Sequence, residues 1–275
     1  MTISVRSNNP ALVALQNLNT TKDNLATVEN RVSSGLSVAQ AKDGGATWAV
    51  AQGQRSDLKA LSAVKMSLDR AQSIADVAVA AGTAVSNLLL ELKDKALAAT
   101  DTTLDASARS SLNVDFKTLL NQVARVVQDS TFDGANLLDG SSPSLRFMAN
   151  ADASSFLTLT GQNLTLGGAI ITLASTDSVS TVTQASNSLA ALTTSITNLS
   201  QSLGGLGSQS SQVTAHNAFV SRLDDAITAG IGNIVDADLS KESARLQALQ
   251  VQQQLGTQAL SIANQAPSII LSLFK

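Results

Sequence analysis

The sequence predicts a mainly α protein: a long antiparallel helical bundle with paired N- and C-terminal coiled-coil helices and a small β-hairpin region mid-chain. Three observations support this fold class. The 275 residues are rich in Ala, Leu, Gln, Ser, Thr and Val and include only three prolines. Apolar residues recur every three or four positions over long stretches, as on one face of a helix. One central stretch of about 40 residues instead carries turn residues and short alternating runs.

The first predicted helix includes Pro10, which suits the first turn of a helix because an N–H is not needed there. The apolar residues that follow fall on a heptad, which is the pattern of a short coiled-coil seam. The two heptad positions hold Ala11, Leu18, Leu25 and Val32, and Ala14, Thr21 and Val28. Thr21 is the weak member of this seam.

Two longer stripes predict helices in the middle of the chain. They consist of Leu112, Phe116, Leu119, Val123 and Val126, and of Val182, Ala185, Leu189, Leu192, Ile196, Leu199 and Leu203. The glycine-rich run 204–207 leaves two interpretations open, a break in the helix or a close approach of two helices. Between the stripes, short runs at 145–147, 156–159 and 170–173 predict strands, because turn residues bound them.

The C-terminal run from Leu246 to Phe274 carries no charge. One side is an uncharged polar stripe made of Gln247, Gln250, Gln254, Thr257, Ser261, Asn264 and Ser268. Another side is apolar, with Ala248, Leu255, Ile262 and Ile269 seven apart and Ala259, Ala266 and Leu273 beside them. Pro267 is expected to end or kink this helix.

The apolar arc of this C-terminal run is wider than one helical partner needs, since a two-helix seam uses about two positions in seven. A lone helix would expose the arc to water, and Gly256 weakens it further. We therefore expect the run to meet the N-terminal helix of its own chain and helices of other copies. Both ends are predicted to be assembly segments that become ordered on association.

Composition excludes several classes of function. The net charge of −3 offers no excess of cations for phosphate backbones, and the absence of cysteine removes disulfides and thiolate metal sites. The single histidine, His216, excludes multi-histidine zinc sites and is expected to be a solvated or hydrogen-bonded helix residue. No stretch has the apolarity of a membrane-spanning helix, and the run from Leu246 to Phe274 comes closest. No catalytic, cofactor-binding or metal-binding residues are expected.

Several blocks of the chain resemble bacterial flagellin. Residues 32–36 (VSSGL) and 41–43 (AKD) are similar to the family's RLSSGLxxxxAKDDAA block, and residues 132–140 (FDGANLLDG) to its FNGxxLLDG block. Near the C-terminus, residues 234–238 (IVDAD) and 241–244 (KESA) lead into QQLGT, ANQAP and a final LSLF. These blocks stand in the expected order, and the resemblance covers nearly the whole chain outside the β segment. The chain therefore resembles a short flagellin with little variable domain.

The resemblance implies that residues 1–43 and 234–275 form the inner core of a hollow filament. Residues 44–140 and 177–233 would form the next layer as a helical bundle, with a β excursion at 141–176. Core and inter-subunit packing would involve Leu18, Leu25, Val32, Leu255, Ile262, Ile269 and Leu273. The uncharged stripe from Gln247 to Ser268 would line a neutral channel, which neither binds charged segments of a passing unfolded chain nor holds its apolar ones.

The resemblance also implies an extracellular structural protein that is exported unfolded by the flagellar type III apparatus and polymerises into a filament for swimming. Its expected partners are copies of itself, alone or mixed with other flagellins, an export chaperone on the C-terminal segment, and the filament cap and hook-junction proteins. Neither nucleic acid nor membrane is expected as a partner. The missing signal peptide agrees with that export route.

Two alternatives stay open. A hook–filament junction protein shares similar terminal blocks, although the full FDGANLLDG block and the ANQAP and LSLF endings favour the filament subunit. A membrane-active amphipathic protein belongs to a different class. It is disfavoured because the C-terminal helix has no basic face to meet anionic lipid.

Overall fold

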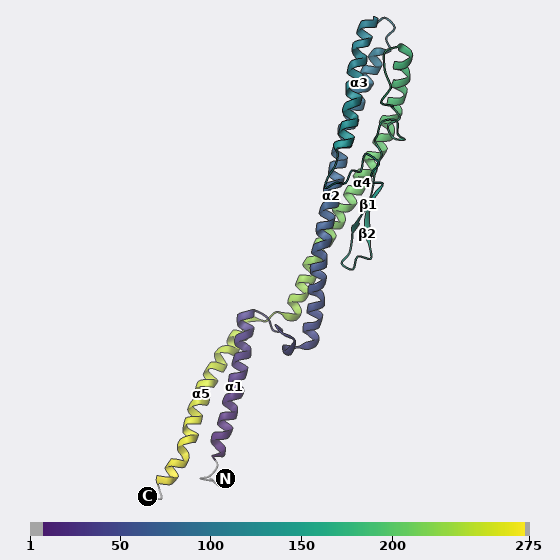
Figure 1. The fold of residues 1–275 in the computed structure, drawn as a ribbon. Helices are drawn as coiled ribbons and strands as arrows, with labels where there is room; N and C mark the ends of the chain where they lie inside the picture. The colour runs from purple at the N-terminus through teal and green to yellow at the C-terminus, as the bar shows by residue number, and fades with distance from the viewer. Residues whose placement is uncertain (1–7, 273–275) are drawn as a thin grey trace. The chain divides into compact units, whose positions relative to one another are not determined.

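The computed structural model describes residues 8–272, with side chains as far as Gln265, and is mainly helical (Figure 1). Its elements are α1 (Asn9–Ser34), the 3₁₀ helix η1 (Ala41–Asp43), α2 (Gly45–Ala99), α3 (Ala106–Asp129), β1 (Ser144–Met148), β2 (Phe156–Thr160), α4 (Val182–Val235) and α5 (Leu239–Ser272). The predicted fold class is confirmed. The chain divides into two compact units, one made of the residues before Asp57 and after Asp225, the other of Asp57–Asp225.

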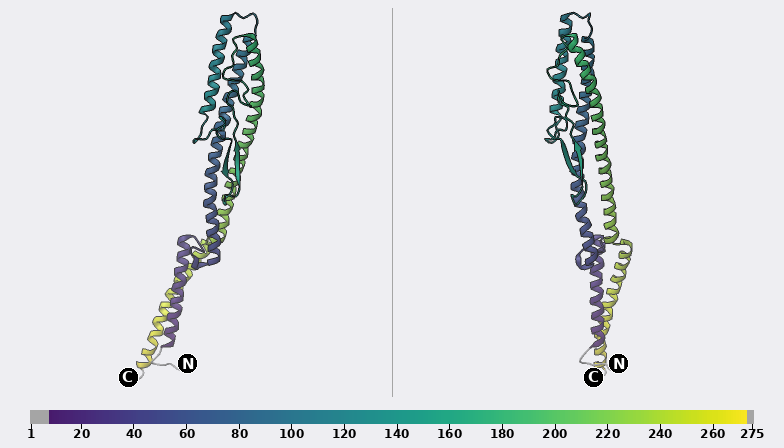
Figure 2. Two further views of the ribbon diagram at one scale, coloured as in Figure 1. Left: turned by 45° about the vertical axis from the view of Figure 1, so that its right-hand side comes forward. Right: turned by 90° about the vertical axis from the view of Figure 1, so that its right-hand side faces the viewer.

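In the first unit, α1 and α5 run antiparallel side by side, as both views of Figure 2 show. The side chain of Asn8 caps α1, Pro10 lies in its first turn, and Gly35 ends it with a φ of +72°. The left-handed φ favours glycine because it has no Cβ. The buried face of α1 is Leu18, Thr21, Leu25 and Val28, so the predicted seam is confirmed, including its weak member.

In the second unit, α2 and α4 lie side by side and are joined by side-chain hydrogen bonds (Figure 1). Their buried residues follow a heptad pattern. The buried positions of α4 include Ala185, Leu192, Leu199, Leu206, Val213 and Val220, each seven residues apart. Those of α2 include Leu61, Val64, Leu68, Ala71, Ala75, Ala78, Val85, Leu89, Leu92, Ala96 and Ala99. This spacing is that of a coiled coil.

The glycines at 204–207 neither break α4 nor mark a close approach. The helix continues through them to Val235, and a Cβ added at Gly204, Gly205 or Gly207 would meet no atom within 4 Å. The close approach of the two helices lies at Leu203, the residue before Gly204. At Gly82 of α2, an added Cβ would overlap Cδ2 of Leu203.

The β excursion has one hairpin and not three strands. β1 and β2 pair antiparallel, with Leu145 opposite Leu159. The expected strand at 170–173 was wrong: Ile171 and Leu173 are fully buried, but the segment has no strand partner. The N–H of Thr172 instead donates to Oγ of Ser195 on α4, so a helix side chain takes the place of a neighbouring strand.

The FDGANLLDG block closes the C-terminal end of α3. Asn136 is 2% exposed, and its Nδ2 donates to the carbonyl oxygen of Val127 at 2.8 Å. Its Oδ1 accepts from the N–H of Leu138 at 2.7 Å and from Oγ of Ser130 at 3.2 Å. One buried amide therefore satisfies a helix-end carbonyl and fixes the following loop.

Of the two outcomes expected at Pro267, an end or a kink, the end of the helix is wrong, because α5 continues to Ser272. The most apolar helical segment is also not the C-terminal run: α2 contains an 18-residue window of mean hydropathy 1.5, long and apolar enough to cross a membrane by composition, of which 39% is buried. Core helices of soluble proteins have the same composition, and in α2 the buried heptad accounts for it.

Candidate assembly surface

The seam between α1 and α5 buries few large side chains. Its core is Leu25 and Val28 of α1 against Leu249 of α5, with Val32 and Leu246 packed at the edge. Farther along, Leu18 is 5% exposed and lies against Gly256, where a Cβ would stand 3.2 Å from its Cδ1. Small residues on α5 therefore let the two helices approach closely.

Leu255 and Ile262 lie outside this seam. They are 61% and 65% exposed, and Val251 beside them is 55% exposed. On α1, Leu12 and Val13 are also more than half exposed. The predicted packing residues thus fall into two groups: Leu18, Leu25 and Val32 are buried or half-buried in the seam of the same chain, whereas Leu255 and Ile262 are exposed beside it. Ile269 and Leu273 lie outside the described side chains.

A groove of about 660 Å³ runs beside the seam on the side of Leu255. α1 contributes Pro10, Val13 and Ala14 to its lining, and α5 contributes Leu255 and Ala259. Its exposed lining is therefore mostly apolar. Val13 was not predicted from the sequence because it lies off the heptad of α1. An exposed apolar residue outside a coiled-coil seam nevertheless indicates contact with a further partner.

The uncharged stripe lies on a further face of α5. Its described members, Gln247, Gln250, Gln254, Thr257, Ser261 and Asn264, are all exposed. Ser268 lies outside the described side chains. Successive members are three or four residues apart, so they share one side of the helix. The exposed surface of α5 therefore divides into an apolar face and a neutral polar face.

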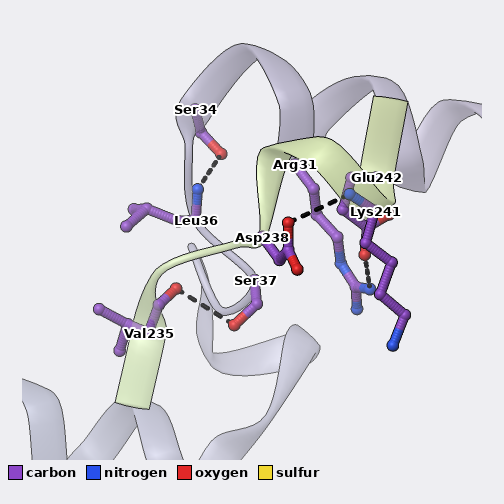
Figure 3. A network of polar contacts seen from close by, with 8 residues as sticks. All are labelled: Arg31, Ser34, Leu36, Ser37, Val235, Asp238, Lys241 and Glu242. Carbon is purple, nitrogen blue, oxygen red and sulfur yellow. Dashed lines mark hydrogen bonds and ion pairs between the residues drawn. The ribbon is translucent and has the colours of Figure 1, made fainter. Parts of the chain in front are cut away.

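The segments that follow α1 and precede α5, residues 35–37 and 235–237, are hydrogen-bonded to each other, and we call this contact the clasp (Figure 3). The N–H of Ser37 donates to the carbonyl of Val235 at 2.7 Å, and the N–H of Ala237 donates to the carbonyl of Gly35 at 2.9 Å. Asp238 begins α5 by accepting from the N–H of Lys241 at 3.1 Å. The two connecting segments thus pair as a minimal antiparallel bridge.

An ion pair stands next to this clasp. Nη1 of Arg31 lies 3.4 Å from Oε1 of Glu242, and the side chains are 30% and 11% exposed (Figure 3). Oε2 of Glu242 is buried and has no hydrogen-bond partner among the described residues. A partly buried ion pair with an unsatisfied carboxylate oxygen contributes little net stability, because the cost of removing the charges from water offsets their attraction.

The described residues show no arrangement for metal binding. They contain no group of three or more His, Asp or Glu side chains that could hold an ion. Nε2 of His216 lies 2.7 Å from the carbonyl oxygen of Ala149, as expected for a hydrogen-bonded helix residue. In the loop after α2, the pKa of Asp101 is lowered because the N–H and then the hydroxyl of Thr103 donate to its carboxylate.

Two protein-family models match the N-terminal and C-terminal parts of the chain. Residues 5–143 match the bacterial flagellin N-terminal helical region, and residues 189–274 match the bacterial flagellin C-terminal helical region. Flagellin FljO of Caulobacter vibrioides is 46% identical over 272 residues, which cover 99% of this chain and 98% of that protein. Flagellin FljJ of the same organism is 46% identical over 280 residues and covers 100% and 99%.

More distant relatives extend the comparison. A flagellin of Brucella melitensis is 34% identical over 281 residues, with 99% of each chain covered. The crystal structure of Bacillus cereus flagellin superposes with a TM-score of 0.50 at 19% identity, covering 56% of this chain and 88% of that one. At this identity the structural likeness shows the fold alone.

Proposed function

Because the chain belongs to the bacterial flagellin family and is a structural, non-enzymatic subunit of the extracellular flagellar filament, we propose that α1 and α5 are the segments through which its copies polymerise. The observation that carries this proposal is the apolar surface that the α1–α5 pair leaves uncovered. Leu255 and Ile262 are each more than 60% exposed beside a largely apolar groove. Neighbouring copies would bury these residues and complete the core that a single chain lacks.

The contacts between copies are heterologous in this proposal. The apolar edge of α5 in one copy meets the groove of the next, so the same pair of unlike surfaces repeats. Heterologous contacts that do not close a ring generate an open helix, which is the geometry of a filament. Residues 1–43 and 234–275 then form the inner core, and residues 44–233 form the layer around it.

We further propose that the uncharged stripe of α5 lines a central channel. Its six described members are exposed and neutral, and they share a face distinct from the apolar one. A neutral polar wall offers neither charges to bind charged segments of a passing chain nor apolar surface to hold its apolar side chains. Replacing Gln254 with lysine should leave seeded polymerisation of purified subunits intact but slow filament growth on cells. Equal growth on cells would contradict the channel assignment.

The subunit would leave the cell unfolded through the flagellar type III apparatus, with an export chaperone on the C-terminal segment, and the finished filament would serve swimming. The exposed apolar face of α5 supports the chaperone proposal, because such a surface invites aggregation before export. Filament cap and hook-junction proteins would meet the same terminal helices. Since Caulobacter vibrioides has several similar flagellins, we also propose mixed filaments.

Adding purified subunits to short filament seeds and imaging them by electron microscopy tests polymerisation. We expect extension into tubular filaments. Capping of the seeds without growth would favour a hook–filament junction protein, and binding to lipid vesicles in place of seeds would favour a membrane-active protein. Either result would contradict the proposal.

A further inference from the structure

The side chain of Asn8 connects the start of α1 with the C-terminal part of α5. Oδ1 of Asn8 accepts a hydrogen bond from the N–H of Ala11 at 3.2 Å, which caps α1. Nδ2 of the same side chain donates to the carbonyl oxygen of Ala263 on α5 at 2.8 Å. The oxygen of this amide therefore binds α1, and its nitrogen binds α5.

The carbonyl that Asn8 binds is one that α5 itself leaves free. In an α-helix the carbonyl of each residue accepts from the N–H four residues later. Four residues after Ala263 stands Pro267, which has no N–H. Since α5 nevertheless continues to Ser272, the Asn8 amide supplies the donor that the proline removes.

We propose that Asn8 and Pro267 are a matched pair that fixes the register of α1 against α5. Pro267 exposes a single backbone acceptor at one place on α5, and Asn8 is the donor at one place on α1. Any slip along the seam would leave the carbonyl of Ala263 without a donor, which is unfavourable for a partly buried polar group. The pair thus acts like the single polar contact that sets register in a coiled coil.

The rest of this part of the seam specifies register weakly. Residues 8–21 of the N-terminal segment and 246–265 of α5 contain no charged side chain. The seam there is made of small, apolar and neutral polar residues such as Ala14, Gly256 and Leu260, so its register depends on packing, such as that of Leu18 against Gly256, and not on charge. Among the described side chains of α1 and α5, the two helices share an ion pair only where α1 ends and α5 begins, between Arg31 and Glu242.

Register matters because it shapes the groove. Val13 of α1 and Leu255 of α5 face the same groove, and Pro10 lies two residues from Asn8. A slip of one heptad would move one wall about 10 Å along the other, because each residue of a helix rises about 1.5 Å. This inference rests on the proposed function, in which a neighbouring copy fills that groove.

Two substitutions separate this role from helix capping. Asn8→Asp keeps the cap, because Asp caps helices as well as Asn, but it replaces the Nδ2 donor with an acceptor. Pro267→Ala returns to α5 an N–H that can reach the carbonyl of Ala263. The wild type, N8D, P267A and the double variant, all full-length, are compared for the rate at which they elongate filament seeds.

We expect N8D to slow elongation roughly tenfold in the wild-type background and less than about twofold when combined with P267A, because the second substitution removes the need for the Asn8 donor. An equal loss in both backgrounds, or no loss in either, would overturn the proposal. If the wild type itself failed to extend seeds, the proposed function would fail, and the register would be decided by the distances below.

A direct readout uses the absence of cysteine in the natural chain. Spin labels at Lys22→Cys and Gln258→Cys, both exposed, report the register by electron–electron distance. The labelled chains are measured free and also copolymerised at low proportion with unlabelled wild type. We expect a single label-to-label distance when the two labels are placed in the otherwise wild-type chain and in the double variant. In labelled N8D we expect a second population whose distance differs by up to about 10 Å. A single unshifted distance in N8D would overturn the proposal.

Discussion

The two helix pairs of this molecule share a heptad repeat but bury it to different degrees. In the α2–α4 pair, Leu68 and Leu192 are fully buried, whereas Leu25 and Leu249 of the α1–α5 pair remain 9% and 8% exposed. The α1–α5 pair also leaves Leu255 61% exposed. The α2–α4 pair, with α3 and the hairpin, closes a core within one chain. The α1–α5 pair has a seam but not a complete core, which is what a polymerising segment requires.

The largest expected effect is on assembly. Leu255→Asp or Ile262→Asp should abolish incorporation into filaments, because a neighbouring copy would have to bury an unpaired carboxylate. Leu255→Gln, which adds no charge, should reduce incorporation less. Thermal unfolding of the monomer should be unchanged in all three, since both side chains are exposed there. Filaments at wild-type yield from either Asp variant would contradict the proposed interface.

Truncating a buried side chain should lower the free energy of unfolding much more in the second unit than in the α1–α5 seam. Phe116 of α3 is fully buried, and Phe116→Ala should lower the free energy of unfolding of its unit by about 3–5 kcal/mol. Leu18→Ala, in the α1–α5 seam, should leave the main thermal transition in place and slow seeded elongation. Calorimetry with a seeding assay measures both. A drop in the main transition from Leu18→Ala as large as that from Phe116→Ala would remove the distinction between the regions.

Substituting two glycines of the α2–α4 pair should change the free energy of unfolding by smaller amounts and in opposite directions. Gly82→Val should destabilise by about 1 kcal/mol, because the new side chain would have to displace the end of the Leu203 side chain. Gly205→Ala, on the facing helix but with open space around the new Cβ, should stabilise by up to about 1 kcal/mol. Denaturant unfolding monitored by circular dichroism compares the two. Equal effects would show that the approach at Gly82 is not tight.

The smallest expected effect concerns the ion pair beside the clasp. Arg31→Glu should destabilise the α1–α5 pair by about 1 kcal/mol, a modest amount because Arg31 is 30% exposed. The exchanged pair, Arg31→Glu with Glu242→Arg, should recover most of the loss. Protease sensitivity of the terminal helices reports the change. No recovery in the exchanged pair would mean that packing, and not charge, holds the inner end.

Much of the α1–α5 pair follows from sequence pattern. The heptad from Ala11 to Val32 identified the buried face of α1, because its apolar residues repeat along the whole helix, whereas the exposed Leu12 and Val13 lie only near its start. The pattern on α5 was less decisive. Its apolar arc is wide, and the face that meets α1 carries Gly256 and Gln253 in place of the large Leu255 and Ile262. Close approach through a glycine is a property of two surfaces, so one helix alone does not reveal it.

The remaining errors also arise from long-range partners. Pro267 normally ends a helix, but the donor that compensates for it comes from Asn8, 259 positions earlier in the sequence. The run 170–173 has the alternation of a strand, but its N–H at Thr172 finds a serine on α4. In each case the local pattern predicted the need for a hydrogen bond, and only the tertiary structure supplies its partner.

Hydrogen–deuterium exchange of the monomer and of the filament shows whether the copies meet at the α1–α5 pair. If copies complete the α1–α5 pair, the amides of α1 and of residues 246–265 should gain protection of at least about a hundredfold on polymerisation, while those of the α2–α4 heptads change little. Equal protection of α5 in monomer and filament would contradict the account. It would mean that the exposed faces of Leu255 and Ile262 are not where the copies meet.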